Sequence, residues 1–139
     1  MRTLLRRKAK VNPRVLCESI KQLYRGEFLH GESDPPWALQ LRERIHVGLI
    51  EVLCRSGEAA LDNHEPDLAA SFYELGLSVD DLVEAFYGGL IRCHSHNGQA
   101  SPAVKTYHQC QAVLSRRLGV APSEGTTRLY LAAIHGKTA

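Results

Sequence analysis

Two stretches of the chain repeat one pattern of side-chain sizes at an interval of 34 residues, and this interval constrains the fold more than any other feature. Each stretch has a small residue, an aromatic residue four positions later and another small residue three positions after that. The two sets are Ala69, Tyr73 and Gly76, and Ala103, Tyr107 and Cys110. Offsets of four and seven place three side chains on one helical face, where small residues let a neighbouring helix approach closely. The pattern predicts that both stretches are second helices of helix-turn-helix hairpins.

An interval of 34 residues is typical of tetratricopeptide repeats, whose hairpins stack and share a core. The chain has 139 residues, of which 44% are hydrophobic and 23% charged. That length suits a single globular domain, and the composition is too apolar for a disordered chain. Helical patterns follow one another with short joints and without strand-like alternation. We therefore expect an all-α fold, a tetratricopeptide-like right-handed stack of antiparallel helix hairpins with about six helices.

Proline, glycine and capping residues mark where these helices should begin and end. The expected starts are Asn12–Pro13, Asp34–Pro36, Pro66, Asp80–Asp81, Ser101–Pro102 and Ser123. The expected stops are Gly26, Leu61, Asn97–Gly98 and Gly119. The longest helix has the best apolar stripe, made of Trp37, Leu41, Ile45, Leu49 and Val52. We expect Trp37 and Phe28 to pack against the core rather than to bind a ligand. The last helix should use Leu129, Leu131 and Ile134.

The formal charge of +2 is unevenly distributed along the chain. Five basic residues lie within the first ten positions, which leaves 12 basic against 15 acidic residues beyond them, a balance of −3. The part of the chain beyond residue 10, with this charge balance, has no broad phosphate-binding face. We expect residues 1–12 to be a basic linker or the end of a missing upstream domain, and 13–136 to be the helical domain. A weaker alternative is that this basic segment contacts nucleic acid through Arg6, Arg7, Lys8 and Lys10.

The cysteines and the absence of targeting patterns indicate the compartment. The four cysteines lie far apart without a CxxC pair, at Cys17, Cys54, Cys93 and Cys110. The sequence has no secretory leader and no apolar run long enough to span a bilayer. We expect a cytoplasmic protein with free thiols and no membrane partner.

Two kinds of chemistry are disfavoured by the pattern. A zinc site would need Cys93, His94 and His96 to converge with His108 and Cys110. Both cysteines, however, lie on apolar stripes, and the spacing on the first helix does not point three ligands one way. The sequence also lacks a glycine-rich phosphate loop, a GxSxG elbow and an HExxH pair. We expect no metal, no cofactor and no enzymatic activity.

Ordered motifs along the chain resemble the bacterial transcriptional activator domain family. They are residues 24–29 (YRGEFL), Trp37 after an acidic loop, 42–44 (RER), 90–94 (LIRCH) before Asn97–Gly98, Tyr107 with Cys110, 118–123 (LGVAPS) and 127–130 (TRLY). The resemblance covers about residues 14 to 134. The chain departs from the family pattern at Asp81, at Gly88–Gly89 and at Gly125. Surface contacts that the family makes near the position of Gly88 are therefore the ones least expected in this chain.

The resemblance implies a noncatalytic regulatory domain of a bacterial transcriptional regulator. Such domains commonly accompany a winged-helix DNA-binding domain or an ATPase, and this chain has neither pattern. The implied partners are proteins: a second copy, giving a homodimer, a linked winged-helix or ATPase domain, or the transcription machinery. DNA would be reached only indirectly. A freestanding tetratricopeptide-like adaptor, binding a peptide or helix in its concave groove, is the alternative.

The repeat interval also selects candidate binding residues. In a stack of hairpins the first helices line the concave side, and residues 34 apart have matching places. Glu51 and Glu58 then correspond to Ala85 and Arg92. We expect Glu51, Glu58 and Arg92 to form a polar partner-binding face; the alternative is a solvated surface with ion pairs worth at most about 1 kcal/mol.

The adjacent glycines Gly88 and Gly89 lie inside an expected helix, where each costs about 1 kcal/mol relative to alanine. We expect them to mark a close contact with another helix. They are also the only sign of backbone room for a small molecule, which a third hypothesis, a small-molecule sensor, would require.

Overall fold

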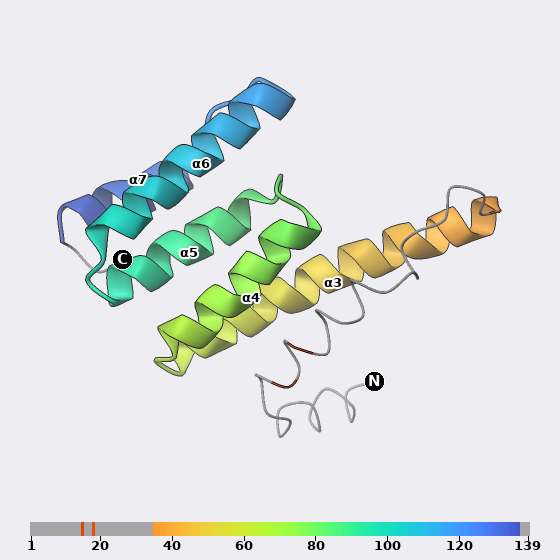
Figure 1. Ribbon diagram of the computed structural model, residues 1–139, viewed down its shortest axis with the longest axis horizontal. Coiled ribbons are helices and arrows are strands. Elements are labelled where there is room, and N and C mark those ends of the chain that lie inside the picture. The colour runs from red at the N-terminus through yellow and green to blue at the C-terminus, as the bar shows by residue number, and fades with distance from the viewer. Residues whose placement is uncertain (1–14, 16–17, 19–34, 137–139) are drawn as a thin grey trace. The chain divides into compact units, whose positions relative to one another are not determined.

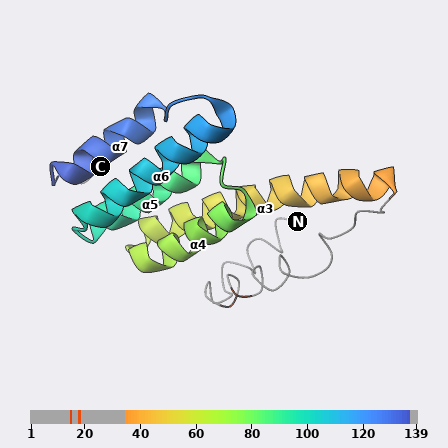
Figure 2. The same ribbon diagram turned by 45° about the horizontal axis from the view of Figure 1, so that its top comes forward.

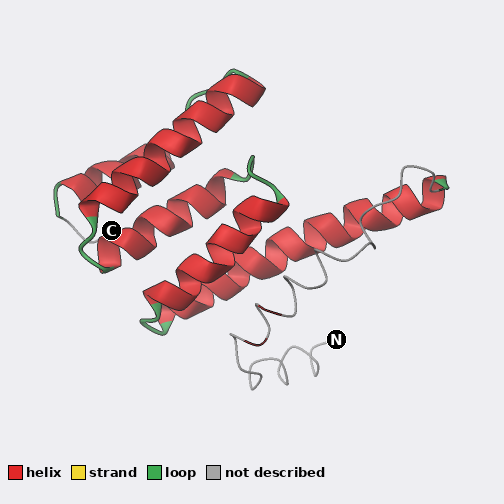
Figure 3. Cartoon of the chain, in the orientation of Figure 1, coloured by secondary structure: helices red, strands yellow, loops and turns green. Residues whose placement is uncertain are grey.

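The computed structural model describes residues 15, 18 and 35–136 of the chain. From residue 35 onward this part forms five helices and no strand, so the expected all-α, tetratricopeptide-like class is confirmed (Figures 1 and 3). The helices are α3 (Pro36–Asp62), α4 (Pro66–Val79), α5 (Glu84–His96), α6 (Ala100–Leu118) and α7 (Glu124–Ile134). The helix expected from Asn12 to Gly26 falls largely outside the described residues.

The chain divides into two compact units, residues 1–48 and 49–139. In the described part of the first unit, Trp37 is 68% exposed and Leu41 is 42% exposed, so the expectation that Trp37 packs is wrong. The buried residues of α3 all belong to the second unit: Leu53, Gly57, Ala60 and Leu61. Phe28 lies outside the described residues.

The second unit is a succession of hairpins in which α5 is central. α5 contacts α4, α6 and α7, and α7 also packs on α6. Figure 2 shows α5 beside α6, with α7 against the same pair. This order puts α4 and α6, the helices that carry the 34-residue pattern, in equivalent places in successive hairpins.

The aromatic residue of the first repeat fits between two glycines. A Cβ atom added at Gly57 or at Gly89 would lie only 2.5 or 2.4 Å from Cζ of Tyr73. The ring of Tyr73 therefore lies against the backbones of α3 and α5 at once. The expected close contact at the adjacent glycines is confirmed, since a Cβ atom at Gly88 would also lie 3.3 Å from Cδ1 of Leu129.

The second repeat packs in the same way but against an extra helix. Tyr107 is 6% exposed, and its ring stacks on that of Tyr130 in α7 with centroids 4.1 Å apart. The buried side of α7 is formed by Thr126 and Ala133 with the partly buried Leu129 and Tyr130. These positions follow helical spacing. Leu131 and Ile134 lie outside that face and are 43% and 39% exposed. Of the three residues expected to pack in this helix, Leu129, Leu131 and Ile134, only Leu129 lies on the buried face.

Most of the expected helix boundaries are confirmed. Gly98 and Gly119 have φ of +66°, the left-handed conformation that ends a helix, and the Oγ atom of Ser123 accepts from the Thr126 amide at 3.3 Å. The expected start at Asp80–Asp81 is wrong, because α5 begins at Glu84. Oδ1 of Asp80 instead accepts from the Leu82 amide at 3.0 Å, which stabilises a turn rather than a helix start.

Candidate functional site: a groove on the first helices of the hairpins

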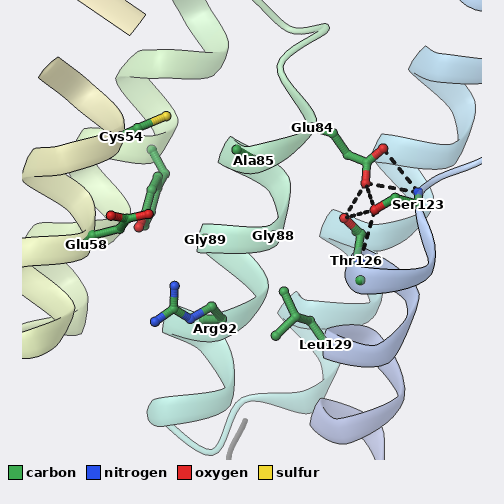
Figure 4. A pocket seen from close by; sticks show the side chains of 12 residues that line it. Cys54, Glu58, Glu84, Ala85, Gly88, Gly89, Arg92, Ser123, Thr126 and Leu129 are labelled. Carbon is green, nitrogen blue, oxygen red and sulfur yellow. Dashed lines mark hydrogen bonds between the residues drawn. The ribbon is translucent and has the colours of Figure 1, made fainter. Parts of the chain in front are cut away.

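A groove of about 630 Å³ lies on the second unit, formed mainly by α3, α5 and α7 (Figure 4). α3 contributes Cys54 and Glu58, and α4 contributes Tyr73. The remaining lining residues are Glu84, Ala85, Gly88, Gly89 and Arg92 of α5, and Ser123, Gly125, Thr126 and Leu129 at α7. The lining thus includes Glu58, Ala85 and Arg92, three of the four residues that the repeat interval related to one another.

The floor of the groove is kept low by small residues of α5. Ala85, Gly88 and Arg92 are spaced by three and four residues and so follow one helical line. Ala85 is exposed, whereas Gly88 is buried against Leu129. A partner approaching this floor therefore meets a methyl group and backbone first, and the guanidinium one turn further along.

The structure brings together two of the three predicted binding residues. Figure 4 shows Glu58 of α3 and Arg92 of α5 extending into the space between their helices. No ion pair joins them, and neither has a hydrogen-bond or ion-pair partner among the described residues. Glu51 is not part of the lining; its carboxylate pairs with Arg55 at 2.6 Å on the exposed surface of α3. The partner-binding role of all three residues stays a prediction.

Tyr73 adds a polar group that the sequence reasoning assigned only to the core. The residue is 2% exposed, and its hydroxyl has no hydrogen-bond partner among the described residues. The other buried tyrosines differ: the hydroxyl of Tyr87 donates to the Asp81 carbonyl at 2.8 Å, and that of Tyr107 lies 2.9 Å from Oγ1 of Thr127. No side-chain oxygen or nitrogen atom of the described residues is both fully enclosed and unpartnered, so the Tyr73 hydroxyl keeps some exposure, and Tyr73 is one of the residues that line the groove.

The electrostatic surroundings of the Tyr73 hydroxyl keep it protonated. Burial raises its pKa to about 12, and the positive charge of Arg92 opposes this rise only in part. The carboxylate of Glu58 acts in the same direction as burial. The hydroxyl is therefore a neutral donor near neutral pH, within electrostatic reach of the two charged residues of the groove.

At the other end of the groove, Glu84 joins the start of α5 to the start of α7. The Ser123 amide donates to both carboxylate oxygens at 3.1 and 3.0 Å, and the hydroxyls of Ser123 and Thr126 both donate to Oε2 (Figure 4). Partial burial alone would raise the pKa of Glu84, but these hydrogen bonds outweigh it and lower the pKa below its usual value. The polar groups here are engaged with one another.

The cysteines near the groove do not form a reactive site. Burial raises the pKa of Cys93 to about 12 and that of Cys110 to about 11, so both thiols stay protonated near neutral pH. Cys54, half-buried in the lining, also has a raised pKa because of burial and the nearby Glu58 carboxylate. Over residues 15, 18 and 35–136, no group of three His, Cys, Asp or Glu residues is arranged to hold a metal ion.

Two other predictions concern regions beyond the groove. Arg6, Arg7, Lys8 and Lys10 lie outside the described residues, so their contact with nucleic acid stays a prediction, as does a domain boundary at residue 12. Among the helices that the structure describes, none is long and apolar enough to cross a membrane.

Comparison with protein families confirms the resemblance seen in the ordered motifs. Residues 2–133 match the family model of the bacterial transcriptional activator domain. No curated protein and no solved structure matches the chain. The match covers nearly the whole sequence, including all the residues that line the groove.

Proposed function

Because the chain belongs to the bacterial transcriptional activator domain family, we propose that it is a noncatalytic module that controls a bacterial transcriptional regulator through protein contacts. The family is regulatory and is not a known enzyme family. In this role the module works in the cytoplasm and contacts a second copy, a linked winged-helix or ATPase domain, or the transcription machinery. It reaches DNA only through such a partner.

The observation that carries the proposal is the division of polar groups in the groove. Glu84, Ser123 and Thr126 satisfy one another, whereas Glu58, Tyr73 and Arg92 have no partner in the described part of the chain. Hydrogen bonds to charged groups are stronger than those between neutral groups. The carboxylate, the guanidinium and the hydroxyl that line this groove are therefore available to the polar groups of a partner protein.

The same groups do not suit catalysis. A nucleophile needs an adjacent base or a lowered pKa, and both Cys54 and Tyr73 have raised pKa values. Binding alone is enough for regulation, because a partner that prefers one arrangement of a multidomain regulator shifts the population toward that arrangement.

The proposal is tested in the native host with the intact gene. Arg92→Glu reverses the charge in the groove, and Arg116→Glu makes the same change at an exposed position of α6 outside the lining. We expect Arg92→Glu to change the same transcripts as deletion of the gene, and Arg116→Glu to leave them as in the wild type. Unaltered transcripts after deletion would refute the regulatory role.

A further inference from the structure

We propose that the groove binds an amphipathic helix of a partner protein through one acidic side chain, which receives hydrogen bonds from the Tyr73 hydroxyl and the Arg92 guanidinium. The inference rests on the proposed function, because it names the kind of partner that the regulatory groove takes. It is carried by three observations: the Tyr73 hydroxyl and the Arg92 guanidinium have no hydrogen-bond partner among the described residues, both residues line the groove, and Ala85 and Gly88 keep its floor low.

The choice of an acidic side chain follows from the free donors. A guanidinium offers planar N–H groups that match a carboxylate, and it accepts no hydrogen bond. The Tyr73 hydroxyl is held in place because its ring lies between Gly57 and Gly89. A carboxylate entering from solvent would therefore meet one fixed neutral donor and one cation, and such charge-assisted hydrogen bonds are the stronger kind.

Glu58 adds a second requirement. Its carboxylate is exposed on the α3 side of the groove and would repel a partner that carried only negative charge. A basic residue three or four positions from the acidic one on the same helix would face Glu58 while the acidic residue faces Arg92. The groove thus favours a helix with an adjacent acid–base pair.

The choice of a helix follows from the shortage of free hydrogen-bonding groups. An extended peptide leaves its backbone N–H and C=O groups to be satisfied by the groove, whereas a helix satisfies most of them internally. Only three lining residues have free polar side chains, since Ser123 and Thr126 are bound to Glu84. The low floor at Ala85 and Gly88, with Leu129 beside it, gives the apolar face of a helix room for close approach (Figure 4).

The test is a selection followed by titration. A displayed library of 18-residue helical peptides, randomised on one face, is selected against the full chain, and the enriched peptides are synthesised with a fluorescent label. We expect an acidic residue on the selected face and a basic residue one turn away. Arg92→Gln should weaken binding about tenfold, and Tyr73→Phe, which keeps the ring in place, about fivefold. Arg116→Gln is the matched control and should change nothing.

Coupling between the partners makes the test specific. Replacing the acidic residue of the peptide by Gln should weaken binding to the wild-type chain about as much as Arg92→Gln does, and should weaken binding to the Arg92→Gln chain no further. Melting curves of each variant check that it is folded.

Several outcomes would overturn the proposal: no enriched binder, binders without an acidic residue, proline-rich extended binders, or affinities that Arg92→Gln and Tyr73→Phe leave unchanged. Glutarate binding as tightly as the peptides would assign the donors to small acids and would also overturn it. If the selection fails while Arg92→Glu still alters transcripts, the acidic helix is refuted and the regulatory role stands.

Discussion

Tyr73 and Tyr107 occupy the same position in successive repeats, 34 residues apart, but only the hydroxyl of Tyr107 has a partner among the described residues. Tyr107 lies 2.9 Å from Oγ1 of Thr127, because α7 covers this side of the second hairpin. The equivalent side of the first hairpin opens into the groove. One repeated residue type thus serves packing alone in one place and leaves a donor for a partner in the other.

This difference predicts that the same substitution lowers stability at one tyrosine and has little effect at the other. Tyr107→Phe removes a hydrogen bond and should lower the free energy of unfolding by about 1 kcal/mol. Tyr73→Phe removes a hydroxyl that has no partner and should change the free energy of unfolding by less than about 0.5 kcal/mol. Urea denaturation of both variants measures this; equal losses would show that the Tyr73 hydroxyl is bonded within the chain.

Packing of the Tyr73 ring predicts the effect of a methyl group at Gly89. In Gly89→Ala the new Cβ atom would lie 2.4 Å from Cζ of Tyr73, and the ring cannot retreat because Gly57 backs it. We expect a loss of about 1–3 kcal/mol despite the better helix propensity of alanine. Gly48→Ala is the control: nothing lies within 4 Å of its added Cβ, so stability should rise by up to about 1 kcal/mol. Thermal denaturation followed by circular dichroism compares them.

The hydrogen bonds to Glu84 predict a dependence of stability on pH. Because its pKa is lower in the folded chain than its usual value of 4.5, its contribution is present above pH 4.5 and is lost as the pH falls through the folded-state value. Glu84→Gln should therefore cost about 1 kcal/mol at pH 7, a figure reduced for partial exposure, and clearly less at pH 3.

Glu124→Gln is the matched control for this effect. Glu124 forms only an exposed pair with Arg128 at 2.7 Å, so its replacement should change stability by less than about 0.5 kcal/mol at either pH. The difference in unfolding free energy between wild type and Glu84→Gln is measured by urea titration. A difference that does not shrink in acid would contradict the assignment.

Burial of the thiols predicts the order of alkylation. With Cys17 replaced by Ser, iodoacetamide at pH 8 should modify half-buried Cys54 first, while buried Cys93 and Cys110 react only on unfolding. The raised pKa values of the latter two, about 12 and about 11, slow them further. Peptide mass mapping with and without denaturant measures the order. Native-state reaction of Cys93 as fast as that of Cys54 would contradict the packing.

Helix ends could be predicted from the sequence where they depend on residues close to one another in the chain. The left-handed glycines Gly98 and Gly119 and the cap Ser123 each depend on residues within one turn. Asp80 and Asp81 were misassigned because a turn and a helix start use the same residue type, and the choice depended on where α5 could pack. Trp37 was misassigned because periodicity shows which residues share a face, not whether another helix covers it.

The groove was only partly accessible for a similar reason. Of the four residues that the repeat interval related, Glu58, Ala85 and Arg92 line the groove, since equivalent residues of stacked hairpins lie on the same surface. Glu51 is two turns earlier on α3, where it pairs with Arg55 instead. The free hydroxyl of Tyr73 and the bonds from Glu84 to residues 39 and 42 positions later have no local signal.

The most direct test of the central claim, that this groove is the contact surface of a regulatory module, is photocrosslinking in the native host. p-Benzoylphenylalanine is placed at Ala85 on the groove floor, and at Lys105 on the exposed side of α6 as the control. The account predicts a protein adduct from position 85 and none from 105, with the adduct mass distinguishing a second copy from another protein. No adduct from position 85, or the same adducts from both positions, would contradict it.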